Sequence, residues 1–178
     1  MRLFDGLREP DLRAFLGTEL EQSSHASFAI RRVRLARVDL TPRELRNMRR
    51  CRVLLGRLDA DALAGPEVTD GTARTATLLD LAASGRLEVR SAPLLTWDPD
   101  FALIGHGAPS DTLVIGSIQF APAARRRPVE ELALACATRD GEAVASAAVR
   151  FEELWERGHD CLEAITDALC RSRSAGDS

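Results

Sequence analysis

A serine, a histidine and an aspartate that could together perform nucleophilic catalysis lie within one short window of the sequence. Ser117 could supply the attacking hydroxyl, His106 the general base, and Asp111 the carboxylate that orients the base. The dipeptide Gly116-Ser117 lacks, however, the Gly-x-Ser-x-Gly elbow that exposes the nucleophile of an α/β hydrolase. Three such residue types often meet in one window by chance, so we do not expect a serine hydrolase.

Side chains that could bind a metal occur at two places, where we expect instead a solvent-facing His159 beside a buried Cys161, and a solvated turn at Asp98 and Asp100. His159, Asp160 and Cys161 are consecutive, and consecutive residues of the helix expected there point in different directions. Asp98 and Asp100 flank a proline, which is typical of a solvated turn; a carboxylate metal site is the alternative. There is no phosphate-cradling glycine loop and no dinucleotide fingerprint. We therefore expect neither a metal nor an organic cofactor.

The positive charge of the chain is concentrated in one segment. All 24 basic side chains are arginines, and residues 31–57 hold ten of them against Asp39 and Glu44. This segment carries a net charge of +8, whereas the rest of the 178-residue chain carries −11, which gives −3 in total. Because a local patch sets the nearby field, such a segment can bind nucleic acid even in an acidic protein.

Four arginines of this segment are candidate nucleic-acid contacts. The sequence from Thr41 to Glu44 has a capping threonine, a proline at the first helical position and the glutamate of a capping box, which predicts a short helix to about residue 50. Such a helix would gather four cations along one stripe, able to contact successive phosphates with little sequence choice: Arg43, Arg46, Arg49 and Arg50. The alternatives are a solvated face, or a surface that docks an acidic protein such as the net −6 segment 140–167 of another copy.

The hydrophobic pattern alternates between helical and strand periods, which predicts an α/β fold. We expect helices over 11–22, 41–50 and 72–84, the third of them ended by Gly85 in a left-handed conformation. A last helix is capped by Asp140 and includes Ile165, and Gly158 either kinks or divides it. Strands are expected at 27–33, 51–55, 87–90, 101–104, 112–115 and 132–137, with 101–104 and 112–115 forming a hairpin. With 45% hydrophobic residues, residues 1–170 can form one domain, followed by a disordered tail over 171–178.

Three motifs carry a resemblance to a known superfamily. Thr112-Leu-Val-Ile-Gly-Ser-Ile-Gln-Phe resembles the strand and Gly-Ser-x-Asn-Phe turn that closes the catalytic motif of phospholipase D-like proteins, with Gln119 in place of the usual asparagine. The acidic Glu131 before an apolar strand, and the sequence Phe151-Glu-Glu-Leu-Trp, are similar to later motifs of that family. The resemblance spans residues 11–169 in element order and implies a phospholipase D-like sandwich, with a mixed sheet and helices on both faces.

The catalytic motif that this resemblance calls for is degenerate. The family uses His-x-Lys-x4-Asp just before the turn, with histidine attacking phosphorus and lysine holding the phosphate, and two such motifs make one site. Counted back from the matching strand, these positions fall on Pro99, Phe101 and His106. A shifted register places His106 first but puts no cation in the lysine position. The resemblance leaves a vestigial phosphate pocket, or residues that only satisfy turn amides, at Ser117, Gln119 and Glu131.

These observations predict a non-catalytic phospholipase D-like domain. Single-repeat members of the superfamily pair across the site, so the resemblance implies a homodimer or pairing with another subunit. We expect a binding or regulatory part of a bacterial complex that processes nucleic acid, DNA or RNA, or acts in defence. An active phosphodiesterase or nuclease with a displaced or partner-completed site is the alternative, and a small-ligand sensor is a third hypothesis. Apolar stretches well short of ~20 residues, and an N-terminus without an apolar signal core, predict a cytoplasmic protein with no membrane partner.

Overall fold

The computed structural model describes residues 1–4, 12–32, 41, 43–57, 72–93, 95, 97–106, 111–116, 135–167 and 170. Among these residues, no helix combines the length and the apolar character needed to cross a bilayer. The predicted loop at 59–71 and tail at 171–178 lie outside the described residues.

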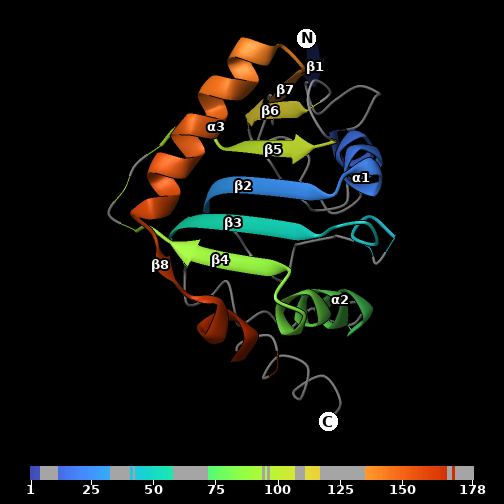
Figure 1. The fold of residues 1–178 in the computed structure, drawn as a ribbon, viewed down its shortest axis with the longest axis vertical. Helices are drawn as coiled ribbons and strands as arrows, with labels where there is room; N and C mark the ends of the chain where they lie inside the picture. Colours follow the sequence, from blue (N-terminus) through green and yellow to red (C-terminus); the bar gives the residue numbers. More distant parts are fainter. Residues whose placement is uncertain are drawn as a thin grey trace, which may run out of the picture.

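An eight-stranded mixed sheet runs through the described residues in the order β1-β7-β6-β5-β2-β3-β4-β8 (Figure 1). Its strands are β1 (Arg2–Phe4), β2 (His25–Arg32), β3 (Arg50–Arg57), β4 (Leu87–Ser91), β5 (Phe101–Gly105), β6 (Thr112–Gly116), β7 (Ala135–Thr138) and β8 (His159–Asp160). The neighbours β2, β3 and β4 are parallel, and every other neighbouring pair is antiparallel. The expected hairpin is confirmed, since Phe101 of β5 pairs with Ile115 of β6.

This topology gives the sheet two chemically distinct edges. At what we call the carboxyl edge, β2, β3 and β4 end, and β5 begins because it runs antiparallel to β2. At the amino edge, β2, β3 and β4 begin and β5 ends. In Figure 1 the carboxyl edge lies on the left, towards which the β4 arrowhead points, and the amino edge lies on the right.

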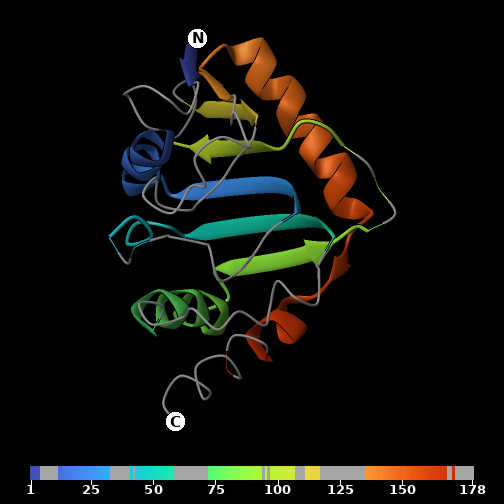
Figure 2. The same ribbon diagram turned by 180° about the vertical axis from the view of Figure 1, so that it is seen from behind.

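Helices cover both faces of the sheet, as expected. The helices are α1 (Leu12–Gln22), α2 (Thr72–Ala83), α3 (Gly141–Glu156) and a short helix over 162–167. Figures 1 and 2 show α3 on one side of the strands and α1 and α2 on the other. Strand β2 serves both layers by alternation: Phe28 and Ile30 belong to the core with α1 and α2, and Ala29 to the core with α3.

The α3 core is dominated by aromatic side chains. Phe151 is fully buried, meets Phe101 edge-on with ring centroids 6.3 Å apart, and stacks on Trp155 at 5.6 Å. Two strand arginines cover these rings from the sheet: the guanidinium of Arg52 lies 4.8 Å from the centre of the Phe151 ring, and that of Arg90 lies 4.8 Å from the centre of the Trp155 ring. Burial of these rings fixes α3 over the carboxyl half of the sheet.

The start and end of α3 follow from its sequence. The Asp140 side chain caps the helix by accepting from the Ala143 amide at 2.9 Å. The chain leaves the helix after Glu156, and β8 then pairs with β4, which confirms the division at Gly158. A Cβ at Gly158 would lie 3.0 Å from both Leu54 Cδ1 and Arg90 Cβ, so this close approach favours glycine.

The predicted helix over 41–50 is wrong. The capping box does form, because the Thr41 amide donates to Glu44 Oε2 at 2.7 Å and the Glu44 amide to Thr41 Oγ1 at 3.3 Å. Residues 43–47 nevertheless form only turns, and Arg50 begins β3. The amides of Arg49 and Arg50 both donate to the Ser24 carbonyl, at 2.7 and 3.2 Å, so strand pairing ends the helical turn.

One further strand was not anticipated. The short β1, which pairs with β7, consists of three residues, which carry too little periodicity. The strand expected over 132–137 is described as β7 over Ala135–Thr138, and residues 132–134 lie outside the described residues. The other expected strands and helices are confirmed within a few residues. Gly85 follows the end of α2 and has a φ of 66°, which is the expected left-handed conformation.

Replacing Phe151 with alanine should lower the free energy of unfolding by about 3–5 kcal/mol, because the change removes a buried ring and leaves a cavity. Val149, on the same helix, is 62% exposed, so Val149→Ala should change that free energy by no more than about 0.5 kcal/mol. Urea unfolding followed by circular dichroism measures both. Equal losses in the two variants would contradict the packing of α3 through Phe151.

Candidate functional site

The carboxyl edge is where the family resemblance places the nucleophile, and here the structure has an ion-paired corner. Arg31, at the end of β2, donates its amide and its Nε to Asp100 Oδ1 at 3.0 and 3.1 Å. Its Nη1 lies 3.1 Å from Asp98 Oδ1. The Asp98 side chain is 75% exposed and that of Asp100 is 13% exposed. One guanidinium thus ties the two carboxylates that flank Pro99 to the end of β2.

The position expected for the catalytic lysine lies inside the core. Phe101 is buried against Phe151 under α3, so its side chain cannot reach a phosphate at the edge. The neighbouring β6 ends beside this corner, where the Gly116 amide donates to the Asp100 carbonyl at 2.9 Å. Gly116 has a φ of 131°, a conformation that favours glycine. The proposed pocket residues beyond it, Ser117, Gln119 and Glu131, lie outside the described residues.

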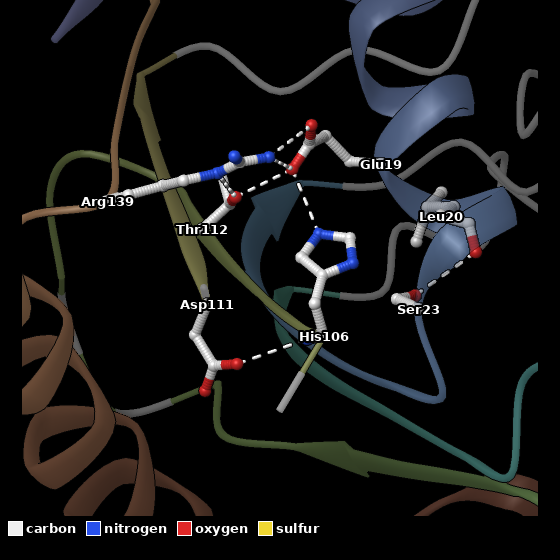
Figure 3. Close-up of polar contacts among 7 residues, drawn as sticks. All are labelled: Glu19, Leu20, Ser23, His106, Asp111, Thr112 and Arg139. Atoms are coloured by element: carbon white, nitrogen blue, oxygen red, sulfur yellow. Dashed lines mark hydrogen bonds and ion pairs between the residues drawn. The ribbon is translucent and has the colours of Figure 1, made fainter. Parts of the chain in front are cut away.

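His106 lies at the opposite end of β5, within a partly buried polar network (Figure 3). Its Nε2 lies 3.0 Å from Oε2 of Glu19 on α1. Thr112 Oγ1 donates to the same oxygen at 2.6 Å, and Arg139 Nη2 donates to both carboxylate oxygens at 3.0 and 3.1 Å. Arg139 Nε also donates to Thr112 Oγ1 at 3.0 Å. The network joins α1, the β5–β6 hairpin and the segment before α3.

The charge of Glu19 is stabilised by this network. Burial opposes ionisation and raises the pKa of the carboxyl, but hydrogen bonds from Thr112, Arg139 and His106, with the nearby charge of Arg139, bring it below its ordinary value of 4.5. The Glu19 side chain is only 7% exposed, so its ionised form depends on these partners. Sequence reasoning missed Glu19 and Arg139, since their positions carry no motif.

The histidine–aspartate pair of the hypothetical serine-hydrolase triad does not form, and Ser117 lies outside the described residues. Asp111 Oδ1 accepts a hydrogen bond from the main-chain amide of His106 at 3.1 Å, while the imidazole pairs with Glu19 instead. His106 is also separated from Pro99 by the full length of β5, roughly 16 Å at 3.3 Å per residue. Its imidazole therefore does not reach the carboxyl edge.

The consecutive His159, Asp160 and Cys161 were expected on a helix, and this prediction is wrong, since the next helix begins at Leu162. His159 and Asp160 form β8, because the chain pairs with β4 after Gly158. Asp160 Oδ1 then caps the next helix by accepting from the Leu162 amide at 2.9 Å, and burial, with the Asp160 charge, raises the pKa of Cys161 to about 11. Within the described ranges, no group of three or more His, Cys, Asp or Glu side chains could hold a metal ion.

The four candidate arginines lie together at the amino edge, although not on a helix. The turn over 43–49 buries Glu44, Leu45 and Met48 and exposes the remaining side chains, among them Arg43, Arg46 and Arg49. Arg50 begins β3 beside them. The turn, cyan in Figure 1, projects on the side of the strands away from α3. The predicted grouping of the arginines is thus retained by a turn.

Carboxylates divide these four arginines into two classes. Arg43 Nε lies 3.0 Å from Glu21 Oε1, and Arg50 Nε lies 2.6 Å from Glu88 Oε1. For Arg46 and Arg49, no ion pair is found among the residues that the structure describes. Two arginines of the cluster are therefore paired with carboxylates while their side chains stay 76% and 52% exposed, and the other two have no carboxylate partner among the described residues.

The turn itself is anchored through Glu44. Arg13 of α1 donates from Nη2 to Glu44 Oε2 at 2.8 Å, and the Thr41 amide donates to the same oxygen. Burial raises the pKa of Glu44, but the hydrogen bonds from Arg13 and Thr41 outweigh it and lower the pKa below 4.5. Asn47 Nδ2 adds a bond to the Glu21 carbonyl at 2.8 Å. The exposed arginines consequently rise from a backbone that is fixed to α1.

Comparison with known proteins shows the fold and no closer relationship. No protein-family model and no curated protein sequence matches the chain. Among solved structures, the chain is similar to TrmBL2, described as an archaeal chromatin protein with a novel mode of DNA binding, with a TM-score of 0.51, 14% identity and coverage of 90% of this chain. The chain spans about half, 54%, of the length of TrmBL2.

Two bacterial structures match over nearly their whole length. Nuc from Salmonella typhimurium, described as a phospholipase D family member, has a TM-score of 0.50 and 13% identity, with 87% of this chain and 93% of Nuc covered. NucT from Helicobacter pylori has a TM-score of 0.50 and 13% identity, with 89% of this chain and 97% of NucT covered. The chain has the phospholipase D-like fold, as the sequence predicted.

Replacing Glu19 with glutamine should lower the free energy of unfolding at neutral pH by about 1–3 kcal/mol, because Arg139 and His106 lose their carboxylate. Since the folded state lowers the pKa of Glu19 below 4.5, its contribution is complete above that pH and is lost as the pH falls through the folded pKa. The difference from the wild type should therefore shrink on acidification. Urea unfolding at a series of pH values measures it, and Glu153→Gln, which breaks an exposed pair with Arg150, serves as the control. A difference independent of pH would contradict this role of Glu19.

Proposed function

We propose that this chain is a non-catalytic phospholipase D-like domain that acts as a binding or regulatory subunit, in a bacterial complex that processes nucleic acid or acts in defence. The observation that supports it most is at the carboxyl edge, where Pro99 stands at the nucleophile position between two carboxylates and Phe101 is buried at the lysine position. Neither position offers a group that could attack phosphorus or hold its oxygens.

Electrostatics at this corner also disfavour a phosphodiester. Asp98 and Asp100 carry two negative charges against the single positive charge of Arg31, whose guanidinium is already directed at both carboxylates. Among the side chains that the structure describes at this corner, a phosphate would meet a net negative charge and no uncommitted guanidinium. The family's reaction needs the reverse, cations that neutralise the charge developing on the phosphoryl oxygens.

The nucleic-acid part of the proposal rests on the amino edge. Exposed arginines gather there, and phosphate contacts need cations and polar donors without a preformed pocket. One structural neighbour is described as a chromatin protein that binds DNA. At 14% identity that description suggests a test and does not transfer a function.

The rival proposal is an active phosphodiesterase whose site is completed by a partner. A second copy of this chain would bring the same Pro99 and Phe101, so pairing of two copies would still supply no nucleophile from these positions. Only a different subunit that carries its own histidine and lysine would complete such a site. If the chain takes part in catalysis, we propose that it does so by pairing with a different subunit. A homodimer of this chain would act only as a binding module.

Purified protein should not hydrolyse plasmid DNA, single-stranded DNA, RNA or bis-p-nitrophenyl phosphate, because Pro99 stands at the position expected for the nucleophile. Product release is followed by gel and by absorbance, with His106→Ala and the exposed His159→Ala as paired variants. Hydrolysis that is lost in His106→Ala and kept in His159→Ala would overturn the non-catalytic proposal.

The protein should bind DNA or RNA at micromolar concentration with little sequence preference. The logarithm of the binding constant should fall with the logarithm of salt concentration, by about 0.7–0.9 for each phosphate contacted, because counterions are released. Fluorescence anisotropy of labelled oligonucleotides at several salt concentrations measures the slope. An absence of salt-dependent binding would remove nucleic acid from the proposal.

A further inference from the structure

Building on the proposed function, we infer that nucleic acid binds at the amino edge through Arg46 and Arg49, at the end of the sheet opposite the degenerate catalytic position. Arg43 and Arg50 belong to the same cluster, but their charges are held by Glu21 and Glu88. The surface is thus made of two contacting arginines and two restrained ones.

The turn that carries Arg46 and Arg49 has a fixed backbone. Leu45 and Met48 are anchored in the core with exposures of 3% and 1%, and Glu44 is bound by Arg13 and Thr41. The Arg49 amide donates to the Ser24 carbonyl, and Asn47 to the Glu21 carbonyl. The backbone that carries Arg46 and Arg49 is therefore fixed before any ligand arrives, which reduces the entropic cost of binding.

The two edges of the sheet differ in the positive charge that they offer to a ligand. The turn presents two exposed guanidiniums for which the described part of the chain provides no carboxylate. At the carboxyl edge, by contrast, Arg31 faces both Asp98 and Asp100. Judged by the described side chains, the turn therefore attracts a polyanion more strongly than the corner of Arg31, Asp98 and Asp100 does.

Polar side chains lie next to the two arginines. His25 is exposed and pairs in register with Arg50 across β2 and β3, and Ser24 joins it to the turn by accepting the Arg49 amide. His25 Nδ1 and Ser24 Oγ lie 2.8 Å apart. Polar donors next to exposed guanidiniums are the side chains that contact phosphate and sugar in protein complexes with nucleic acid.

The composition of the turn surface favours nucleic acid over a protein partner. The exposed residues of the turn are all polar, namely Arg43, Arg46, Asn47 and Arg49. A stable protein interface needs a buried centre rich in aromatic and apolar side chains, whereas binding to a phosphate backbone needs only cations and hydrogen-bond donors. The turn therefore fits a nucleic-acid backbone better than an acidic protein surface.

The test for the contacting residues is the double variant R46Q/R49Q, measured by anisotropy with single-stranded and duplex oligonucleotides. Affinity should fall roughly tenfold at moderate salt, equally for all sequences, and the salt slope should decrease by about 2 because two phosphate contacts are lost. The matched control is R150Q/R157Q, which removes the same charge from two exposed positions on and just after α3 and should leave the slope unchanged. Circular dichroism checks that each variant is folded.

The restrained arginines allow a test by gain of affinity. Glu21→Gln and Glu88→Gln should each raise affinity severalfold, since they release Arg43 and Arg50 and remove a negative charge near the ligand. Glu153→Gln removes the same charge from an exposed pair with Arg150 on α3. This control should bind like the wild type, so a rise in all three variants would show only an effect of net charge and would overturn the inference.

The outcomes separate this inference from the proposed function. If the wild type binds no nucleic acid, the nucleic-acid proposal fails and this surface fails with it. If the wild type binds, R46Q/R49Q binds equally well and Arg31→Gln loses affinity, the function stands and the site lies at the carboxyl edge. If R46Q/R49Q loses binding only to a peptide corresponding to residues 140–167, the surface docks a second copy of the chain and the inference is wrong.

Discussion

The antiparallel pairing of β5 with β2 is the constraint on which the rest of the molecule depends. It aligns Ala29 with Phe101 and His25 with Gly105, and so places the start of β5 beside the end of β2. Because of this register, the Asp98–Asp100 corner meets Arg31 at one edge, and His106 meets Glu19 at the other. A parallel β5 would exchange the two ends and bring His106 towards the position of the family's motif. The separation of the two polar clusters is therefore a property of strand direction.

Both buried carboxylates of the amino edge involve α1. Glu19 belongs to that helix and is bound by residues from β5, β6 and the segment before α3, while Glu44 comes from the turn and is bound by Arg13 of α1. In each case the ion pair is satisfied by further hydrogen bonds, which offsets the cost of burying the charge. The helix thus orients two distant parts of the chain relative to the sheet, and the arginine turn is held in place as part of the core.

Local signals in the sequence predicted most of the elements, and long-range contacts decided where prediction failed. The hairpin at Phe101 and Thr112, the cap at Asp140 and the break at Gly158 each depend on neighbouring residues, and each is confirmed. The helix at Thr41 failed although its capping box formed, because the Ser24 carbonyl, remote in sequence, accepts the amides that would have continued it. The network around Glu19 could not be predicted, because Glu19 is 93 residues from Thr112 and 120 residues from Arg139 in the sequence. The arginine cluster was predicted correctly because arginines that are close in the sequence stay close in space, whether the segment forms a helix or a turn.

The aromatic core under α3 gives the protein a built-in optical probe. The chain has two tryptophans and no tyrosine, and both Trp97 and Trp155 are buried in this core. Arg90 lies over the Trp155 ring and donates to its carbonyl at 2.8 Å, so the indole senses the end of β4. Intrinsic fluorescence therefore reports on the carboxyl half of the sheet and is insensitive to a ligand on the turn at the far edge. Emission and anisotropy together can distinguish which end of the molecule a ligand occupies.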